Sequence, residues 1–430
     1  MKAINSQTGE TRNWFWSGVE CGMLIVSIVG IMGLACSTKE KQDTSVDPRS
    51  VLDSIPLDLD SAADLSVPGE FDDLEAVIRD SMDGGNRIDT DDLNRVGNAL
   101  VLQGKYKKAV GFVEVALNQS SQAGDTTRVL GSMDRMGLIL FSIGDLDKAL
   151  EYRTDALLLA RSLGNKEREA AQLNAIGVIL QIQGALVEAL QNFQDGLELV
   201  REVGSRIGEA NCLSNIGLIY QDQGDMDEAL KYQEQALELA REIGSRRAVA
   251  DLLGNIGVIH LARAEPDEGL RHLKEALEIH TELGDREREA IGLGNIGLAY
   301  RATGKPEAAL ENFCKAVEIC REEGLRRQEG SNLASIGLIH LDRRELNTAQ
   351  HYLVQALGIH REVGFRQGEA NQLANIGLVH RVRGKRDLAL GYLNDALAIL
   401  DTCGLAHGRG WIEKAIAEIE AEQKGGSATP

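Results

Sequence analysis

A glycine recurs at a constant interval along most of this chain, and no insertion or deletion interrupts the spacing. The series is Gly97, Gly137, Gly177, Gly217, Gly257, Gly297, Gly337 and Gly377. A small residue keeps the same interval at Ala116, Ala156, Gly196, Ala236, Ala276, Ala316, Ala356 and Ala396. A further glycine ends each unit at Gly124, Gly164, Gly204, Gly244, Gly284, Gly324, Gly364 and Gly404. Eight tandem copies, from about residue 85 to 404, predict a repeat array.

The first half of each unit has the pattern of an amphipathic helix. In the copy at 205–244, the apolar residues Leu213, Ile216 and Tyr220 fall three or four positions apart, which places them on one helix face. Gly224 then interrupts the pattern. We therefore expect a first helix, which we call helix A, that ends at this glycine.

The second half begins and ends with residues typical of helix termini. Asp225 is a good N-cap, and Glu228 follows three residues later in the arrangement of a capping box. Gly244 comes directly after the second helix, where a left-handed residue often ends a helix. Two other copies have Pro266 and Pro306 at the expected first position, which tolerates proline. Each unit is therefore predicted to add a second helix, helix B.

Small residues explain why the two helices should pair. A glycine within a helix costs about 1 kcal/mol relative to alanine, so eight of them at one position imply that backbones approach closely there. Gly217 on helix A would face Ala229 and Ala236 on helix B. One such hairpin cannot bury its apolar face alone, and stacked neighbours form a continuous core. The predicted fold class is all-α, an α-solenoid.

These positions resemble the tetratricopeptide repeat (TPR) family. The family pattern corresponds here to Leu213, Ile216–Gly217, Tyr220, Gly224, Ala229, Tyr232 and Ala236. The period of 40 residues exceeds the usual value of about 34 and is similar to the long-helix subtype in kinesin light chains and Pins-type adaptors. The resemblance implies a right-handed α-solenoid of eight tandem helix-turn-helix repeats, and it implies a binding protein without naming the partner.

Composition excludes some classes of function. The net charge of −20 and the pI of about 4.9 argue against nucleic acid as a partner, since that requires a basic face. Aromatic residues are 4% of the chain, so the core should consist of Leu, Ile, Val and Ala. The cysteines lack zinc-site spacing. Those of the repeats are expected to be buried small hydrophobic residues, namely Cys212, Cys314, Cys320 and Cys403.

Residues 1–36 have the layout of a bacterial secretory signal, with an apolar run from Cys21 to Leu34. A cysteine after Leu-Ala resembles a lipobox, which implies lipidation at Cys36. An uncleaved signal anchor is a second interpretation, and a buried or mis-started N-terminus is a third. The first two place the chain in the cell envelope, anchored in the membrane, with the repeats outside the cytoplasm.

The segments that flank the repeats have different compositions. Residues 37–84 are rich in Asp, Ser and Pro, and we expect a disordered acidic tether. Residues 405–424 have a helical apolar pattern that includes Trp411 and Ile412, which predicts a C-terminal capping helix. Residues 425–430 should form a disordered tail.

No catalytic motif is present, so we expect no enzymatic activity, no cofactor and no metal site. His260, His340 and His380 share one repeat position with Tyr220 and Tyr300. Equivalent helices stand about 8–10 Å apart, too far for three imidazoles to bind one metal with bonds of ~2 Å. These histidines are therefore predicted to be packing residues.

An asparagine ladder is the candidate binding site. The position two residues before the helix-A glycine holds an amide or hydroxyl in five repeats, and two further asparagines lie one turn earlier. The set is Asn211, Asn215, Asn255, Asn295, Ser335, Asn371 and Asn375. Asparagine is a mediocre helix former, so its recurrence inside helices needs a reason. A side-chain amide can both donate and accept, which suits the backbone of an extended peptide.

The TPR resemblance implies that these asparagines line a concave groove and hold ligand backbone. Arg95 and Arg135 occupy the same position in the first two repeats, where they would favour acidic ligand side chains. The alternative is that the amides bond neighbouring helices or water. Two charged series are predicted to be solvated. One pairs a cation early in helix A with a glutamate three residues later, and the other is a basic edge at the A–B turns of the last four repeats.

The sequence therefore predicts a membrane-tethered scaffold that binds a protein or an extended peptide in its concave groove. The alternative is a self-associating structural component, a homo-oligomer whose groove binds its own tether or another copy.

Overall fold

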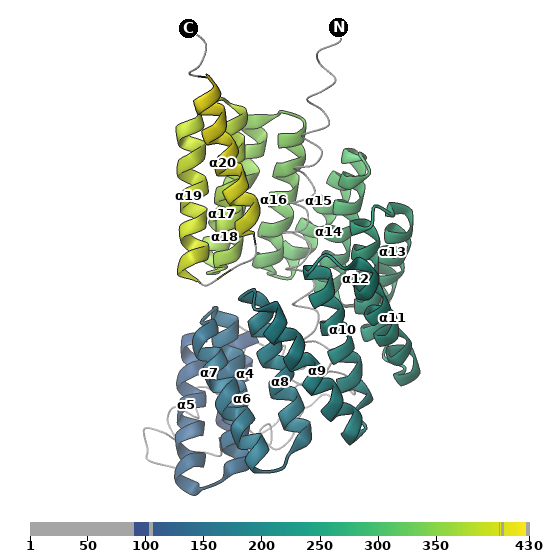
Figure 1. The fold of residues 1–430 in the computed structure, drawn as a ribbon, viewed down its shortest axis with the longest axis vertical. Helices are drawn as coiled ribbons and strands as arrows, with labels where there is room; N and C mark the ends of the chain where they lie inside the picture. The colour runs from purple at the N-terminus through teal and green to yellow at the C-terminus, as the bar shows by residue number, and fades with distance from the viewer. Residues whose placement is uncertain (1–89, 103–105, 404, 406–407, 427–430) are drawn as a thin grey trace, which may run out of the picture. The chain divides into compact units, whose positions relative to one another are not determined.

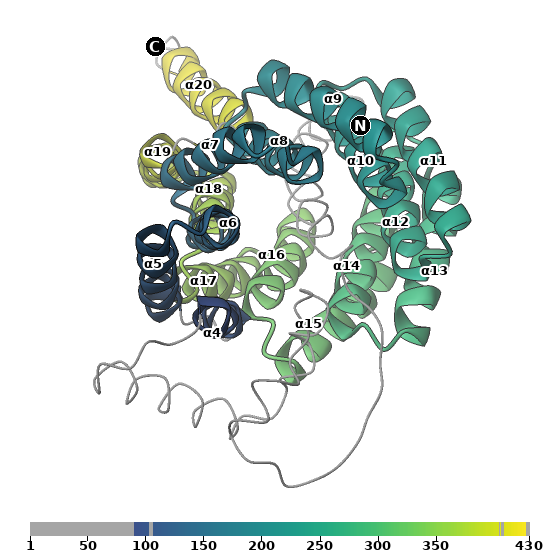
Figure 2. The ribbon, with the colours of Figure 1, turned by 90° about the horizontal axis from the view of Figure 1, so that it is seen from below.

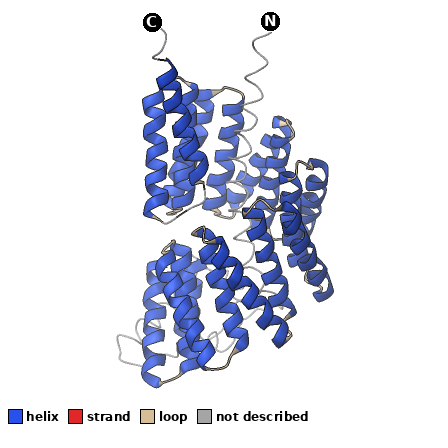
Figure 3. Ribbon diagram, in the orientation of Figure 1, coloured by secondary structure: helices blue, strands red, loops and turns tan. Residues whose placement is uncertain are grey.

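The computed structural model describes residues 90–102, 106–403, 405 and 408–426. In these ranges the chain forms helices and no strands (Figure 3). The expectations for residues 1–36, for the tether at 37–84 and for Gly404 lie outside them. None of the helices in the described part is both long enough and apolar enough for a membrane crossing.

Helices follow one another at a regular interval along the chain (Figure 1). Their bounds are α4 Thr90–Leu102, α5 Tyr106–Ala123, α6 Thr126–Ile143, α7 Leu146–Ser162, α8 Lys166–Ile182, α9 Leu186–Val203, α10 Arg206–Asp222, α11 Met226–Ile243, α12 Arg246–Ala262, α13 Pro266–Glu282, α14 Arg286–Ala302, α15 Pro306–Glu322, α16 Arg326–Asp342, α17 Leu346–Glu362, α18 Arg366–Val382, α19 Arg386–Thr402 and α20 Arg409–Gly426. The even-numbered helices up to α18 are the A helices of the repeats, and the odd-numbered ones are the B helices.

The described residues fall into two compact units. One contains Leu180–Leu190 and the chain from Glu209 onward, and the other contains the chain up to Ile179 together with Gln191–Gly208. Within each unit, a helix A packs on the helix B that follows it, and that helix B packs on the next helix A. Figure 2 shows this pairing along α12 to α19. The all-α solenoid predicted from the spacing is confirmed.

The helix-A glycine permits close packing in all eight repeats. A Cβ atom built at Gly177 would lie 2.6 Å from Phe193, and one at Gly257 would lie 2.7 Å from Leu273 and 3.0 Å from the carbonyl oxygen of Gly269. In each repeat the residue of helix B that lies against this glycine is sixteen positions later in the sequence. These residues are Val113, Arg153, Phe193, Gln233, Leu273, Phe313, Leu353 and Leu393. The predicted approach of the two backbones is therefore confirmed.

Helix termini follow the predicted signals. Asp225 caps α11 by accepting a hydrogen bond from the backbone N–H of Glu228, and Gly244 ends the helix with φ of 79°. Pro266 and Pro306 stand at the starts of α13 and α15, as expected.

The C-terminal helix α20 packs against α19. Its residues Ile412, Ala415 and Ile419 are fully buried and belong to the same core cluster as Leu393 and Leu400 of α19. The apolar pattern near the end of the sequence therefore covers the exposed side of the last repeat.

The cysteine prediction is wrong in part. Cys212 and Cys320 are buried, but Cys314 is exposed and Cys403 is half-buried. Cys314 lies on α15 two residues before Ala316, on the side of the helix that faces away from the core. None of these four cysteines forms a disulfide within the described residues.

Candidate functional site

The asparagine ladder runs along the A helices of the unit that begins at Glu209, on α10, α12, α14, α16 and α18. Asn215 has no exposed surface, and Asn295 is also buried. The half-buried members are Asn211, Asn255, Ser335, Asn371 and Asn375. Neighbouring A helices contact one another between α12 and α18, so the ladder positions of these four helices follow in sequence.

Some ladder side chains form hydrogen bonds within their own helix. Asn375 Nδ2 donates to Gln372 Oε1 at 3.1 Å, and Asn371 Oδ1 accepts from Gln367 at 3.3 Å. Ser335 donates to the carbonyl oxygen of Ser331 at 3.1 Å. A side-chain amide has two N–H donors and one oxygen acceptor, and each hydrogen bond described here uses only one of these groups. The half-buried members therefore keep hydrogen-bonding capacity for another group.

Gln233 connects Ser214, the residue before ladder position Asn215, to Asn255 in the next repeat, a contact that the repeat pattern did not predict. Its side chain is fully buried on α11. Gln233 Nε2 donates to the carbonyl oxygen of Ser214 at 3.0 Å, and Gln233 Oε1 accepts from Ser214 Oγ at 3.1 Å and from Asn255 Nδ2 at 3.5 Å. A polar residue where most repeats have Leu or Phe was the available signal.

Small residues beside the ladder have different surroundings. A Cβ atom at Gly254 would contact nothing within 4 Å, so the surface next to Asn255 is open. A Cβ atom at Gly294 would lie 2.9 Å from Asn332 Oδ1, because the side chain of Asn332 on α16 reaches toward α14. A ligand could therefore approach closely at Gly254, whereas Asn332 already occupies the space at Gly294.

The two predicted arginines lie in the other unit. Arg95 on α4 forms an ion pair with Asp92 at 3.2 Å. Arg135 on α6 donates to the carbonyl oxygen of Gly131 at 3.0 Å and pairs with no carboxylate in the described part of the chain. Burial lowers the pKa of Arg135, and the nearby cation Arg168 lowers it further, while Asp134 acts in the opposite direction.

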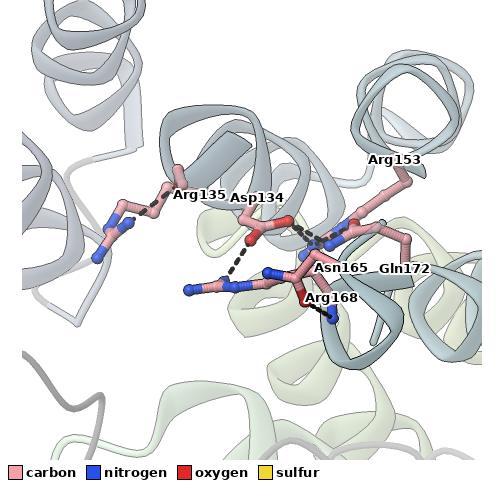
Figure 4. A network of polar contacts seen from close by, with 7 residues as sticks. Asp134, Arg135, Arg153, Asn165, Arg168 and Gln172 are labelled. Carbon is pink, nitrogen blue, oxygen red and sulfur yellow. Dashed lines mark hydrogen bonds and ion pairs between the residues drawn. The ribbon is translucent and has the colours of Figure 1, made fainter. Parts of the chain in front are cut away.

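A polar network surrounds the half-buried Asp134, next to Arg135 (Figure 4). Asp134 Oδ2 accepts from Arg168 at 2.7 Å, and Asp134 Oδ1 lies 3.4 Å from Arg153 and accepts from Gln172. Arg153 also donates to Gln172 Oε1 at 3.2 Å. Arg153 occupies the helix-B position that packs on the helix-A glycine, and its burial lowers its pKa. We call Asp134, Arg135, Arg153 and Arg168 the basic cluster.

A second polar network joins three helices in the unit that contains the chain from Glu209 onward. His280 Nε2 on α13 lies 3.5 Å from Asp251 Oδ1 on α12, and Arg288 on α14 lies 3.4 Å from the same oxygen. Burial raises the pKa of Asp251 to about 6, an effect that Arg288 opposes. Burial lowers the pKa of His280 to about 4. Arg247 and Asp285, which pair at 3.0 Å, are the other charged groups beside this network.

The predicted packing role of the shared histidine position agrees with the contacts observed there. Four of the five rings at this position stack on the aromatic ring twelve positions later on helix B, whereas Tyr300 has Asn312 at that place. The pairs are Tyr220–Tyr232 at 5.4 Å, His260–His272 at 5.4 Å, His340–Tyr352 at 5.6 Å and His380–Tyr392 at 5.3 Å between ring centroids. No group of three or more potential metal ligands converges anywhere in the described ranges.

The predicted ion pairs early in helix A form at Arg286, Arg326 and Arg366, and the carboxylates of the last two pairs are not solvated. Arg326 pairs with Glu329 and also reaches Glu362 at the end of the next helix B, at 2.7 Å. Glu329 and Glu369 are buried, with 3% and 6% of their surface exposed. The expectation of a solvated row is wrong here because Arg326 links two repeats and covers the carboxylate between them.

The basic edge at the A–B turns consists largely of paired cations. Arg301 contacts Asp342 at 2.9 Å, and Arg343 contacts Glu307 at 2.6 Å. Arg381 lies 3.2 Å from Glu418 of α20. These arginines therefore link neighbouring repeats and have carboxylate partners within the chain.

The family model described as tetratricopeptide repeat matches residues 125–202, 167–242 and 248–322. No curated protein sequence matches the chain.

Three solved structures have a similar fold. A Rap protein complexed with Competence and Sporulation Factor is 14% identical, with a TM-score of 0.56 over 78% of this chain and 94% of that one. The Rap conjugation gene regulator of plasmid pLS20, in complex with the Phr* peptide, is 15% identical, with a TM-score of 0.55 over 72% and 94%. The apo quorum sensor NprR from B. thuringiensis is 14% identical, with a TM-score of 0.53 over 82% and 98%.

At these identities the structural likeness shows the fold, and the family match shows the kind of repeat. Both agree with the helix pairs, the close approach at the helix-A glycine and the regular interval between helices. The repeats within residues 125–242 and 248–322 are tetratricopeptide repeats.

Proposed function

We propose that this protein is a scaffold that binds an extended peptide, or an extended segment of a partner protein, along the asparagine ladder. The observation that carries the proposal is the row of half-buried amides and hydroxyls on successive A helices, with hydrogen-bonding capacity that their own helices leave unused. An extended peptide presents one donor and one acceptor per residue, and a row of amides can match both.

The comparisons support a peptide ligand. One of the similar structures holds the Phr* peptide, and its TM-score with this chain is 0.55. Because repeats of this family act as binding surfaces, we propose a binding protein rather than an enzyme. The ladder supplies hydrogen bonds and no nucleophile or acid–base pair.

Gly254 offers a direct test of the ladder as a binding surface. The Gly254→Gln variant would place a side chain in open space beside Asn255 and so obstruct a ligand without disturbing the core. Gly391→Gln is the matched control, because Gly391 is equally open but lies on the exposed face of α19. Crosslinking pull-downs from native membranes with the full-length chain should lose a partner only with Gly254→Gln.

Asparagine substitutions test the hydrogen bonds themselves. We expect Asn255→Ala combined with Asn375→Ala to weaken binding by about 2 kcal/mol, at roughly 1 kcal/mol for each bond. Asn312→Ala combined with Asn394→Ala removes two asparagines from B helices and should leave binding unchanged. A partner list that is the same for all variants would reject the ladder as the binding surface.

Self-association is the second candidate function. If the ladder binds another copy, crosslinking should give a product of twice the chain mass that Gly254→Gln abolishes. If it binds the chain's own residues 37–84, deletion of that segment should make the ladder more accessible to an added probe. Neither change is expected for a scaffold with a separate partner.

We further propose that residues 1–36 tether the protein to the bacterial cell envelope through a lipid on Cys36, with the repeats outside the cytoplasm. The Leu-Ala-Cys sequence after an apolar run supports this proposal. Labelling with a fatty-acid analogue should mark the wild type and not Cys36→Ala. Retention of the label in that variant would reject Cys36 as the lipidated residue.

A further inference from the structure

Carboxylates near the ends of some A helices meet an arginine from the preceding repeat. Arg301 of α14 donates to Asp342 at the end of α16, at 2.9 Å. Arg381 of α18 contacts Glu422 of α20 at 2.5 Å. In both pairs the carboxylate lies 41 residues after the arginine. The repeat geometry therefore places these two positions side by side, with the cation on the earlier helix.

Asp222 occupies the same position at the end of α10, but its partner is an amide. Gln181 Nε2 of α8, 41 residues earlier, donates to Asp222 Oδ2 at 2.7 Å. Asp222 Oδ1 is enclosed and has no hydrogen-bond partner within the described residues. In that part of the chain, Asp222 therefore lacks the cation that Arg301 provides to Asp342.

The surroundings of Asp222 disfavour an unpaired negative charge. Burial raises the pKa of Asp222 to about 7, an effect that the hydrogen bond from Gln181 opposes. Burial also raises the pKa of Asp342, but there the charge of Arg301 opposes the effect. A buried charge without its partner is costly unless another cation reaches it. Asp222 as a whole is half-buried, so part of the residue is open to a ligand.

Other enclosed oxygens on α10 also lack donors. Asn211 Oδ1 and Gln221 Oε1 are buried and accept no hydrogen bond within the described structure. Asn211 and Asp222 share a helix face with the ladder residue Asn215, because they lie four residues before it and seven residues after it. At 1.5 Å per residue, Asp222 is about 10 Å along the helix from Asn215. This part of the ladder therefore favours a ligand that donates hydrogen bonds.

We propose that Asp222 and Gln181 form a cation-binding subsite, which selects peptides that carry a lysine or arginine side chain or a free N-terminal ammonium group. Such groups have donors and no acceptor, and they form charge-assisted hydrogen bonds with a carboxylate. Gln181 holds the carboxylate through Oδ2 and leaves Oδ1 for the ligand. Both residues belong to the unit that contains the asparagine ladder. This inference rests on the proposed peptide-binding function and names the charge of the ligand.

The test measures the binding of three pools of peptides with randomised sequence to the purified full-length chain by fluorescence anisotropy. All peptides carry fluorescein at an amidated C-terminus. The first pool contains Lys and Arg and is acetylated at the N-terminus. The second has Gln instead of Lys and Arg and a free N-terminus, and the third has Gln and is acetylated. We expect the first or the second pool to bind at least about tenfold more tightly than the third, as a charge-assisted hydrogen bond implies.

Two substitutions assign that preference to the subsite. Asp222→Asn removes the negative charge, keeps the size of the side chain and should reduce the preference about tenfold. Gln181→Arg supplies the cation from within the chain, as Arg301 does for Asp342, and should also remove the preference. Position 181 should accept an arginine, because only 8% of the Arg301 side chain is exposed at the equivalent place. Neither substitution should change the binding of the third pool.

Control variants separate the subsite from the general attraction between cations and an acidic chain. The net charge of −20 attracts any positively charged peptide. Glu238→Gln removes one exposed negative charge from α11, and Val187→Lys adds one positive charge at a residue that is 75% exposed. Each control matches the charge change of one subsite variant, and neither should alter the preference. Thermal unfolding of all four variants checks that the chain is folded.

The outcomes separate the subsite from the ladder. Equal binding of all three pools, or a preference that survives both Asp222→Asn and Gln181→Arg, overturns the cation subsite. A preference that the two controls reduce equally also overturns it, because net charge then explains the binding. If the third pool binds and Gly254→Gln abolishes that binding, the ladder function stands even where the subsite fails. Binding by no pool overturns both. A larger preference for the first pool assigns the cation to a side chain, and a larger preference for the second assigns it to the N-terminus of the peptide.

Discussion

Gly257 of α12 lies directly against Leu273 of α13, and a Cβ atom at Gly257 would come within 2.7 Å of Leu273 Cγ. The same relationship recurs in every repeat, with a different residue on helix B. It accounts for the glycine that returns at the same position of every unit, because any side chain there would separate the two helices. The packing of helix A on helix B therefore explains why this position of the repeat is glycine.

Gly257→Ala should destabilise the protein by about 1–3 kcal/mol, because overpacking at this contact forces the helices apart. Gly254→Ala, three residues earlier on the same helix, is the control. Its Cβ atom would meet nothing within 4 Å, so the higher helix propensity of alanine should stabilise the protein by up to about 1 kcal/mol. Urea unfolding followed by circular dichroism measures both. Similar midpoints for the two variants would contradict the packing argument.

Two A–B turns lack the glycine that the other described turns have. Ala264 and Arg344 adopt φ of 59° and 60°, in the left-handed region where a Cβ atom is unfavourable. Arg344→Gly should therefore stabilise the protein by about 0.5–1 kcal/mol, after the greater entropy of glycine in the unfolded chain is subtracted. The converse variant, Gly304→Ala at φ of 70°, should destabilise it. Thermal unfolding measures both, and a lower melting temperature for Arg344→Gly would refute the strain.

The Asp251–His280 pair should make stability depend on pH in two opposing ways. The pKa of Asp251 rises in the folded state from 3.8 to about 6, so its contribution is greatest below pH 3.8 and is lost as pH rises toward 6. The pKa of His280 falls from 6.5 to about 4, so its contribution is present above pH 6.5 and is lost as pH falls toward 4. Between pH 4 and 6 the two effects should largely cancel in the wild type.

Single substitutions would reveal each effect. In His280→Gln the free energy of unfolding should increase as pH falls from 6 to 4, because only Asp251 responds. In Asp251→Asn it should decrease over the same range, because only His280 responds. Each change should be about 1–3 kcal/mol. Urea unfolding at several pH values tests this, and slopes of the same sign in both variants would show that other groups dominate.

The cysteines should differ sharply in reactivity. Burial raises the pKa of Cys320 to about 12, and the thiol is enclosed, so it should resist alkylation in the folded protein. Cys314 is exposed on the same helix and should react readily. Mass spectrometry of iodoacetamide-treated protein assigns each site. Both cysteines should react in guanidinium chloride, and rapid alkylation of Cys320 without denaturant would contradict its burial.

Much of the fold could be predicted because one local pattern was repeated eight times. The constant spacing of the units, the glycine that faces helix B and the caps such as Asp225 each act within one hairpin or between adjacent hairpins. In a solenoid every contact is short in sequence, so a pattern visible in one repeat predicts the packing of the next. The ladder positions followed from the same helical spacing.

The burial and pairing of polar side chains could not be predicted in this way, because they depend on contacts between neighbouring repeats. Sequence spacing predicted ion pairs such as Arg326 with Glu329, but only the structure showed that Glu329 is buried and that Arg326 also reaches Glu362. The repeat pattern placed Arg153 and Gln233 on B helices but did not predict their contacts. Only the tertiary structure showed that Arg153 pairs with Asp134 and that Gln233 bonds to Ser214.

The sequence by itself determined the helical pairs and their order, because these depend on backbone geometry that recurs along the chain. The tertiary structure alone decided which polar groups are buried, which are paired and which keep unused donors. Burial and pairing depend on side chains that differ from one repeat to the next. The distinction between Arg95, neutralised by Asp92, and Arg135, without a carboxylate in the described residues, is of this second kind.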